Sequence, residues 1–163
     1  MREVLEACAR NMSAVDIPAG ETLLQEGKRA GILYVLAEGE VEISKGEYQV
    51  ALLSQPGTVL GDISVLLETP HTATVKTATP CRLYVVSAPL DFLRAHPEAA
   101  LDIAQLLAER LHAMTTYLVD LKKQYEGSDD HFGMVDEVLE TLSHAQRAGH
   151  DPGSKRDPDP DVT

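Results

Sequence analysis

The sequence has little cysteine, few basic residues and no long apolar run. Its two cysteines, Cys8 in a predicted helix and Cys81 beside a strand start, have no partner at CxxC spacing, so we expect buried, reduced thiols. No apolar run approaches the roughly 20 residues that span a bilayer. Glu3 and Glu6 occupy the first turns, where a signal peptide has basic and apolar regions. These absences predict a cytoplasmic protein that does not enter a membrane.

The sequence also has far fewer basic than acidic residues. Lysine and arginine number 14 against 26 aspartate and glutamate residues, which gives a formal net charge of −12. Because basic side chains that neutralise phosphates supply most nucleic-acid affinity, this balance argues against a nucleic acid as partner. An anionic small ligand must therefore be captured by a local group of donors against the overall field.

Signatures of catalytic and metal sites are also missing. The chain contains no GxSxG motif and no P-loop. Its six histidines show neither HxH nor HExxH spacing. We therefore expect a non-enzymatic protein that requires no cofactor and holds no metal.

Residues 14–87 have the texture of antiparallel β-structure. Short alternating or β-branched runs are separated by glycines at 20, 27, 31, 39, 46, 57 and 61. The runs predict strands at 22–25, 32–37, 41–44, 48–53 and 82–87, with extended segments at 58–60 and 72–75. The predicted fold is mainly β with flanking helices: an antiparallel β-roll, similar to a jelly roll, followed by a long helix.

Helical patterns flank this region. Residues 1–11 predict a short helix and residues 90–95 another, with a break at His96-Pro97-Glu98. A heptad seam then predicts one long helix that pairs with a second copy. The alternative is that this helix lays its stripe on its own β-roll. The seam consists of Ala100, Ala104, Leu107, Leu111, Met114, Leu118, Leu121 and Tyr125.

The C-terminal part predicts a separate element. Residues 127–130 break the long helix, and residues 131–147 predict an amphipathic helix that must dock on something. The Pro- and Asp-rich tail that follows has no core-forming residues, so we expect it to be disordered. We divide the chain into a domain at 1–126, with the β-roll at 13–88 and helices at 90–126, and a C-terminal helix and tail at 127–163.

Residues 61–75 combine a loop, a one-turn helix and the start of a strand. Gly61 allows a sharp turn or the close approach of a ligand. Asp62 and Ser64 fall in the first turn of an apolar segment, where free backbone N–H groups can hold an anion. Pro70 ends that turn. We expect a ligand pocket here.

This order of residues resembles the phosphate-binding cassette of the cyclic nucleotide-binding domain, found in catabolite-activator-type regulators, protein kinase A regulatory subunits and gated channels. Asp62 stands where the family has the glutamate that accepts the ribose 2′-hydroxyl. His71 stands where it has the arginine that pairs the cyclic phosphate. The resemblance covers most of residues 13–126, and the cassette matches are Gly61, Ile63, Ser64, Val65, Leu66, Thr72, Ala73 and Val75.

The resemblance implies a sensor of cyclic AMP or cyclic GMP. Its long helix closes the pocket with one face and forms a parallel homodimer with the other, here through residues 100–125. We expect it to signal to a protein partner through the C-terminal helix, without a DNA-binding domain. The implied ligand-binding residues are Gly61, Asp62, Ile63, Ser64, His71, Thr72 and Ala73, with Met114 and Thr115 from the long helix. Arg110, one turn from Met114, can face the cassette and substitute in part for the missing arginine.

Two cassette positions leave alternatives open. Asp62 is suited to capping the one-turn helix, although ligand contact is slightly favoured, and His71 is equally suited to being an exposed turn histidine. Because imidazole lacks the planar fork and permanent charge of arginine, we expect cyclic-nucleotide affinity to be weakened on the order of a hundredfold. The alternative functions are a scaffold that has lost the nucleotide, and a sensor of another anion or of haem through His71.

Overall fold

The computed structural model describes residues 7–125 and 133–144. The chain divides into two compact units, residues 1–107 and 108–163. The boundary lies within the longest helix, α4 (Pro97–Gln124). The division at residue 126 that the sequence suggests stays a prediction.

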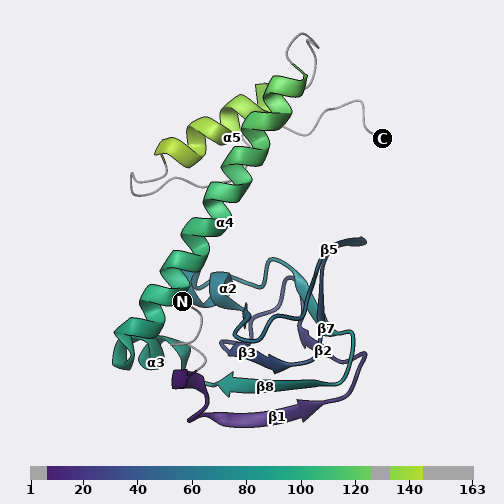
Figure 1. Ribbon diagram of the computed structural model, residues 1–163, viewed down its shortest axis with the longest axis vertical. Helices are drawn as coiled ribbons and strands as arrows, with labels where there is room; N and C mark the ends of the chain where they lie inside the picture. Colours follow the sequence, from purple (N-terminus) through teal and green to yellow (C-terminus); the bar gives the residue numbers. More distant parts are fainter. Residues whose placement is uncertain (1–6, 126–132, 145–163) are drawn as a thin grey trace. The chain divides into compact units, whose positions relative to one another are not determined.

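Two four-stranded antiparallel sheets form the body of the first unit (Figure 1). Sheet A has the strand order β1-β8-β3-β6 and comprises β1 (Ser13–Ile17), β8 (Cys81–Val86), β3 (Leu33–Glu38) and β6 (Val59–Leu60). Sheet B has the order β2-β7-β4-β5 and comprises β2 (Thr22–Leu24), β7 (Thr74–Thr77), β4 (Val41–Lys45) and β5 (Tyr48–Leu53). The predicted β-roll with flanking helices is confirmed.

Successive side chains of β3 point to opposite faces of sheet A and pack into two different hydrophobic cores. Leu33 and Val35 are fully buried on the face that meets the helices, whereas Leu36 is fully buried on the opposite face. Burying each such side chain contributes about 1.5 to 3 kcal/mol of transfer free energy. The second core lies between the sheets and consists of Leu24, Leu36, Val41, Leu60, Val75, Cys81 and Leu83.

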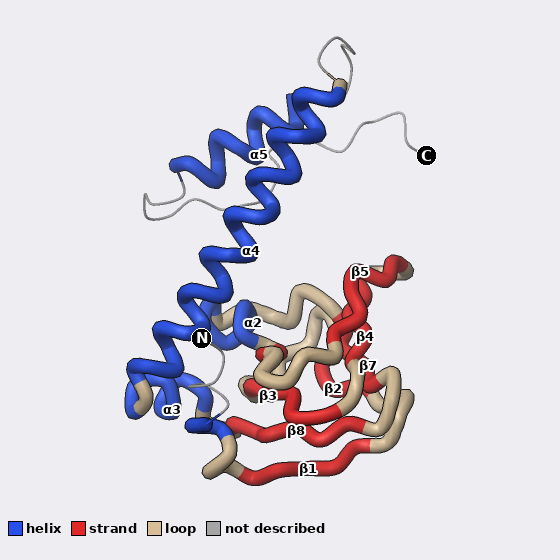
Figure 2. Tube along the Cα trace, viewed as in Figure 1, coloured by secondary structure: helices blue, strands red, loops and turns tan. Residues whose placement is uncertain are grey.

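Helices lie at one end of the strands of sheet A (Figure 2). α3 (Pro89–Ala95) begins with a proline and has His96 as its C-cap, and α4 begins at Pro97. The helix breaks where predicted, but only at His96, since Pro97 and Glu98 already belong to α4. The buried stripe that packs on sheet A is Ala99, Ile103 and Leu106, and two residues of the predicted seam, Ala100 and Leu107, are partly buried against the same core. The first turns of α4 therefore cover the chain's own β-roll, as the alternative interpretation holds.

The second unit contains the C-terminal half of α4 and α5 (Gly133–His144). An ion pair between Lys122 and Asp136 joins the two helices. α5 lies within the predicted helix at 131–147, whereas the predicted break at 127–130 and the predicted tail lie outside the described residues. In the part of the chain that the structure describes, the helices are too short or too polar to cross a membrane.

Candidate functional site

The cassette begins at Gly61, which connects β6 to α2 (Asp62–Leu67). Gly61 is the N-cap of α2 and has a φ of +91°. A Cβ atom built on it would lie 2.8 Å from the carbonyl oxygen of Ile32. Only glycine combines this conformation with so close an approach of two backbone segments. The position of α2 on the β-roll therefore depends on the absence of a side chain here.

A buried hydrogen bond links α2 to the segment before β7. Ser64 Oγ lies 2.8 Å from His71 Nδ1, and the two residues are 9% and 5% exposed. The backbone fixes His71 as well: its N–H donates to the Lys28 carbonyl and its carbonyl accepts from the Gly27 N–H, both at 2.9 Å. These contacts correct the interpretation of His71 as an exposed turn histidine. It is a core residue of the cassette.

The other ring nitrogen of His71 is the unusual atom of the site. Nε2 is buried and has no hydrogen-bond partner among the residues that the structure describes. Buried polar atoms nearly always make a hydrogen bond, so we expect a ligand or a water molecule to bind this nitrogen. Burial lowers the pKa of His71 below its ordinary value of 6.5. The imidazole is therefore neutral near pH 7 unless an anion approaches it.

The remaining cassette positions differ in exposure. Asp62 is 6% exposed and is the first residue of α2; Gly61 is the N-cap, and α2 has no side-chain cap hydrogen bond there. Asp62 is therefore the first helical residue of α2 and not its N-cap residue. Ile63 and Thr72 are exposed, and Ala73 is half-buried. β7 begins at Thr74, two residues later than predicted, so Thr72 and Ala73 belong to the loop.

Residues 14–94 match the family described as the cyclic nucleotide-binding domain. This chain contains a cyclic nucleotide-binding domain. The match includes the whole cassette and nearly all of the first unit from β1 to α3.

Curated relatives carry the domain within longer proteins. The CRP-like cAMP-activated global transcriptional regulator of Mycobacterium tuberculosis is 29% identical over 125 residues, which are 72% of this chain and 55% of the regulator. A cGMP-dependent protein kinase of Drosophila melanogaster, isozyme 2, is 31% identical over 86 residues, which are 53% of this chain and 7% of the kinase. The chain therefore spans about half of the first relative and a small part of the second.

Solved structures agree on the fold. The catabolite activator protein of Thermus thermophilus matches 91% of this chain and 87% of its own with a TM-score of 0.60. Its sequence identity is 22%, so this likeness concerns the fold alone.

The cyclic nucleotide-binding domain of this chain gathers only some of the predicted site residues. Gly61, Ser64 and His71 are joined by hydrogen bonds, since Ser64 Oγ also lies 3.1 Å from the Gly61 carbonyl oxygen. Arg110, Met114 and Thr115 belong to α4 in the second unit, and Thr115 Oγ1 donates to the Leu111 carbonyl. Their contribution to the ligand site stays a prediction.

A cavity of about 400 Å³ was not foreseen from the sequence. It lies beside α2 and α3 and is lined by Ser64 and Thr69 of the cassette as well as by Arg29 and Arg94. Arg29 Nη1 donates to the Glu68 carbonyl oxygen at 2.9 Å. Arg29 precedes β3 and Arg94 lies on α3, so no sequence pattern connects them. Only the folded chain brings these two arginines to one cavity.

Proposed function

We propose that this domain is a non-enzymatic sensor that binds a cyclic nucleotide in the cassette at residues 61–73. The proposal rests mainly on His71 Nε2, a buried nitrogen with no hydrogen-bond partner among the described residues. His71 stands at the position where the family has the arginine that pairs with the cyclic phosphate. The names of the matched regulator and kinase refer to cyclic AMP and cyclic GMP. Cyclic AMP is the first candidate, because the match to the regulator covers more of this chain. The cytoplasmic location stays a prediction.

Ser64 determines whether a neutral His71 can donate to a phosphate. Its single hydroxyl proton has two acceptors within reach, the Gly61 carbonyl oxygen at 3.1 Å and His71 Nδ1 at 2.8 Å. If Ser64 donates to Nδ1, the neutral ring carries its proton on Nε2, which then donates to a phosphate oxygen. If Ser64 donates to Gly61, Nε2 is an acceptor and repels the phosphate. A bound phosphate therefore selects the first arrangement.

The other groups of the cassette complete the proposed contacts. The Asp62 carboxylate accepts the ribose 2′-hydroxyl, and the exposed Thr72 hydroxyl donates to the phosphate. Met114 and Thr115 would meet the base once α4 closes over the ligand, and Arg110 would add positive charge. The ligand favours such a closed state only by the difference between its affinities for the two states. Closure would alter the packing of α5, which a protein partner would then detect.

One observation favours the second candidate, a scaffold without nucleotide. His71 Nε2 is closed to solvent and has no hydrogen-bond partner within the described part of the chain, so a ligand must displace the groups that cover it before pairing with it. The neutral ring also replaces the charged partner that the family uses. In this alternative, the chain acts through dimerisation and α5 alone. A sensor of haem through His71 is the third possibility, and purified protein that is colourless would argue against it.

Calorimetric titration with cyclic AMP, cyclic GMP and 2′-deoxy cyclic AMP tests the proposal. At pH 7 and low salt we expect micromolar affinity for one of the first two nucleotides and a roughly tenfold loss, about 1.4 kcal/mol, for the 2′-deoxy compound. Asp62→Asn should remove most of this difference, whereas Asp91→Asn on α3 should keep it. The absence of heat with both nucleotides up to millimolar concentration would favour the scaffold.

Affinity should depend on pH through His71. Because imidazolium pairs with phosphate better than imidazole does, the bound state has the higher His71 pKa, and affinity rises as pH falls through the interval between the bound and free pKa values. Burial lowers the free value below 6.5, so the rise extends below pH 6.5 and reaches at most about tenfold per pH unit. Calorimetry from pH 8 to 5 measures it. His112→Gln should keep the profile and His71→Gln should flatten it; a flat wild-type profile would rule out this role.

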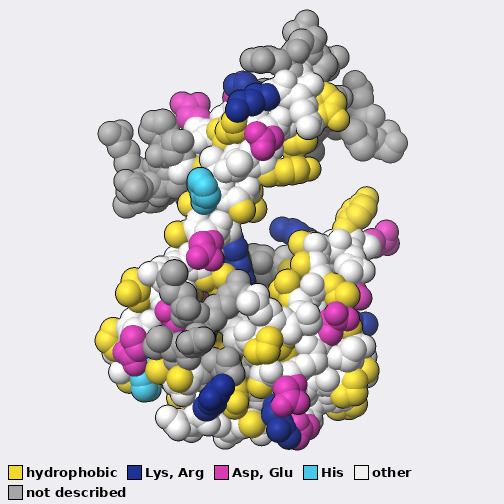
Figure 3. All heavy atoms as spheres, in the orientation of Figure 1, with side chains coloured by type: hydrophobic (Ala, Val, Ile, Leu, Met, Phe, Trp, Pro, Cys, Tyr) yellow, Lys and Arg dark blue, Asp and Glu magenta, His cyan; other side chains and the backbone are white. Residues whose placement is uncertain are grey.

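We also propose a homodimer through residues 100–125. On α4, Leu111 is 45% and Met114 56% exposed, which is unusual for a predicted seam unless a second copy covers it. Figure 3 shows hydrophobic side chains reaching the surface along α4. A parallel pair of helices would bury both residues.

Leu111→Asp should therefore dissociate the dimer. A carboxylate buried in the seam without a partner costs several kcal/mol, which weakens association by roughly a hundredfold or more. Sedimentation equilibrium should give twice the 17.7 kDa chain mass for the wild type and the single mass for the variant. Thr116→Asp adds the same charge away from the seam and should stay dimeric. Equal masses for wild type and Leu111→Asp would contradict the proposed interface.

A further inference from the structure

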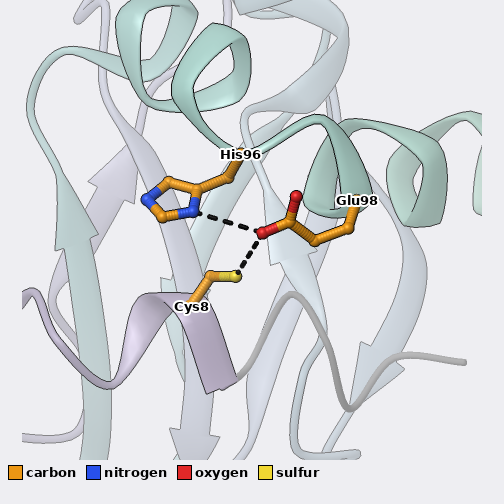
Figure 4. Close-up of side chains that lie close together, drawn as sticks. All are labelled: Cys8, His96 and Glu98. Atoms are coloured by element: carbon orange, nitrogen blue, oxygen red, sulfur yellow. Dashed lines mark hydrogen bonds and ion pairs between the residues drawn. The ribbon is translucent and has the colours of Figure 1, made fainter.

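Three side chains with metal-binding atoms meet in the first unit, and none belongs to the cassette (Figure 4). Cys8 lies in the helical residues 7–9, His96 follows α3, and Glu98 lies in the first turn of α4. One donor atom of each lies within 4.8 Å of the other two. Cys8 Sγ is 3.5 Å and His96 Nδ1 is 3.3 Å from Glu98 Oε1.

The packed backbone holds these residues in place. Cys8 precedes Ala9, which is fully buried against the helix-facing side of sheet A. The His96 N–H donates to the Phe92 carbonyl at 2.9 Å, and the His96 ring centroid lies 4.8 Å from that of Phe92. The His96 carbonyl accepts from the N–H of Ala99 at 3.0 Å, which joins α3 to α4. The donor atoms are therefore brought together by folding, before any ion binds.

The donor set and two of its three separations fit a tetrahedral zinc ion, and the third separation is at most 4.8 Å. Zinc takes thiolate, imidazole and carboxylate ligands, whereas calcium and magnesium prefer oxygen alone. Bonds of about 2.0 to 2.3 Å at tetrahedral angles separate donor atoms by roughly 3.3 to 3.6 Å. The two separations from Glu98 Oε1, 3.3 and 3.5 Å, lie in this range.

We propose that Cys8, His96 and Glu98 form a zinc site with three protein ligands and a fourth position for water. The ion would tie residues 7–9 to the junction between α3 and α4. This inference does not depend on cyclic-nucleotide binding, since it involves neither the cassette nor the cavity beside α2.

The charge around Cys8 supports a cation. The carboxylates of Glu98 and Asp102 both lie close enough to the Cys8 thiol to act on it electrostatically. In the metal-free protein the neutral thiol donates to Glu98. When zinc binds, the sulfur–hydrogen bond is replaced by a sulfur–zinc bond and the proton passes to the buffer. Without a metal, the negative carboxylates of Glu98 and Asp102 disfavour a thiolate at Cys8. With zinc bound, the same carboxylates attract the cation.

Titration of the full chain with Co²⁺, followed by displacement with Zn²⁺, tests the site. We expect one equivalent of Co²⁺ to produce a thiolate-to-cobalt charge-transfer band in the near ultraviolet, and Zn²⁺ to abolish it. Cys8→Ser should lose the band, while Cys81→Ser, which alters the other cysteine, should keep it. Absence of the band at millimolar Co²⁺, or its survival in Cys8→Ser, would overturn the proposal.

The two remaining ligands have matched controls as well. His96→Gln and Glu98→Gln should weaken Co²⁺ binding by about a hundredfold, since even outer-shell partners of a metal contribute about 10- to 100-fold. His112→Gln and Glu109→Gln should bind as the wild type does. Zn²⁺ should raise the midpoint of thermal unfolding of the wild type and not of Cys8→Ser. Circular dichroism establishes that each variant is folded, and an equal Zn²⁺ effect on all of them would refute the site.

Discussion

Replacing Gly39 with alanine is expected to destabilise the folded chain by about 2 to 5 kcal/mol, the sum of backbone strain and overpacking. Gly39 has a φ of +98° and follows the bulge at the end of β3. A Cβ atom there would lie 2.4 Å from the Pro80 carbonyl oxygen and 2.7 Å from Cys81 Sγ. Two of its three nearest atoms belong to the backbone, so no change of rotamer relieves the clash.

Gly20→Ala separates the two causes. Gly20 has a φ of +85°, but a Cβ atom there meets nothing within 4 Å. Its replacement therefore carries only the strain of the left-handed conformation, about 1 to 2 kcal/mol. Urea denaturation followed by circular dichroism measures both losses. If both variants lost the same free energy of unfolding, the loops at 39 and 80 would separate at little cost, and the proposed clash at Gly39 would be wrong.

The sequence predicts the β-roll well because glycines mark its turns and alternation marks its buried faces. β3, β4 and β5 lie within a residue or two of their predicted bounds. β1 carries no such signal: its residues are exposed or half-buried, and its place is fixed by backbone pairing with β8, about 70 residues later. A strand held by a distant partner leaves little trace in its own composition.

The candidate sites were harder to predict than the fold, because their residues also interact with partners that lie far away in the sequence. Gly27 and Lys28 hold the His71 backbone from more than 40 residues away, and the His71 side chain, which local sequence suggests is exposed, is buried. Cys8 and His96 lie 88 residues apart, so no spacing rule foresees their meeting. Gly61 and Ser64, by contrast, interact within one turn, and the cassette pattern identified both.

His71→Arg is expected to raise cyclic AMP affinity on the order of a hundredfold. Two charge-assisted hydrogen bonds from a guanidinium to the phosphate replace one bond from a neutral ring, and each contributes about 1.5 to 3 kcal/mol. A gain of about 2.7 kcal/mol corresponds to this change in the dissociation constant. Calorimetry with both proteins at pH 7 measures it.

Gln49→Arg is the matched control for His71→Arg. It adds the same charge at an exposed position of β5, outside the cassette, so it should raise affinity little. Without ligand, the buried guanidinium of His71→Arg should lower the unfolding midpoint, and cyclic AMP should raise that midpoint more than it does for the wild type. If the folded variant binds no better than the wild type, the phosphate does not lie at residue 71. If it gains as expected, the cassette is intact apart from this one side chain, and the natural histidine makes it a weaker, pH-dependent sensor.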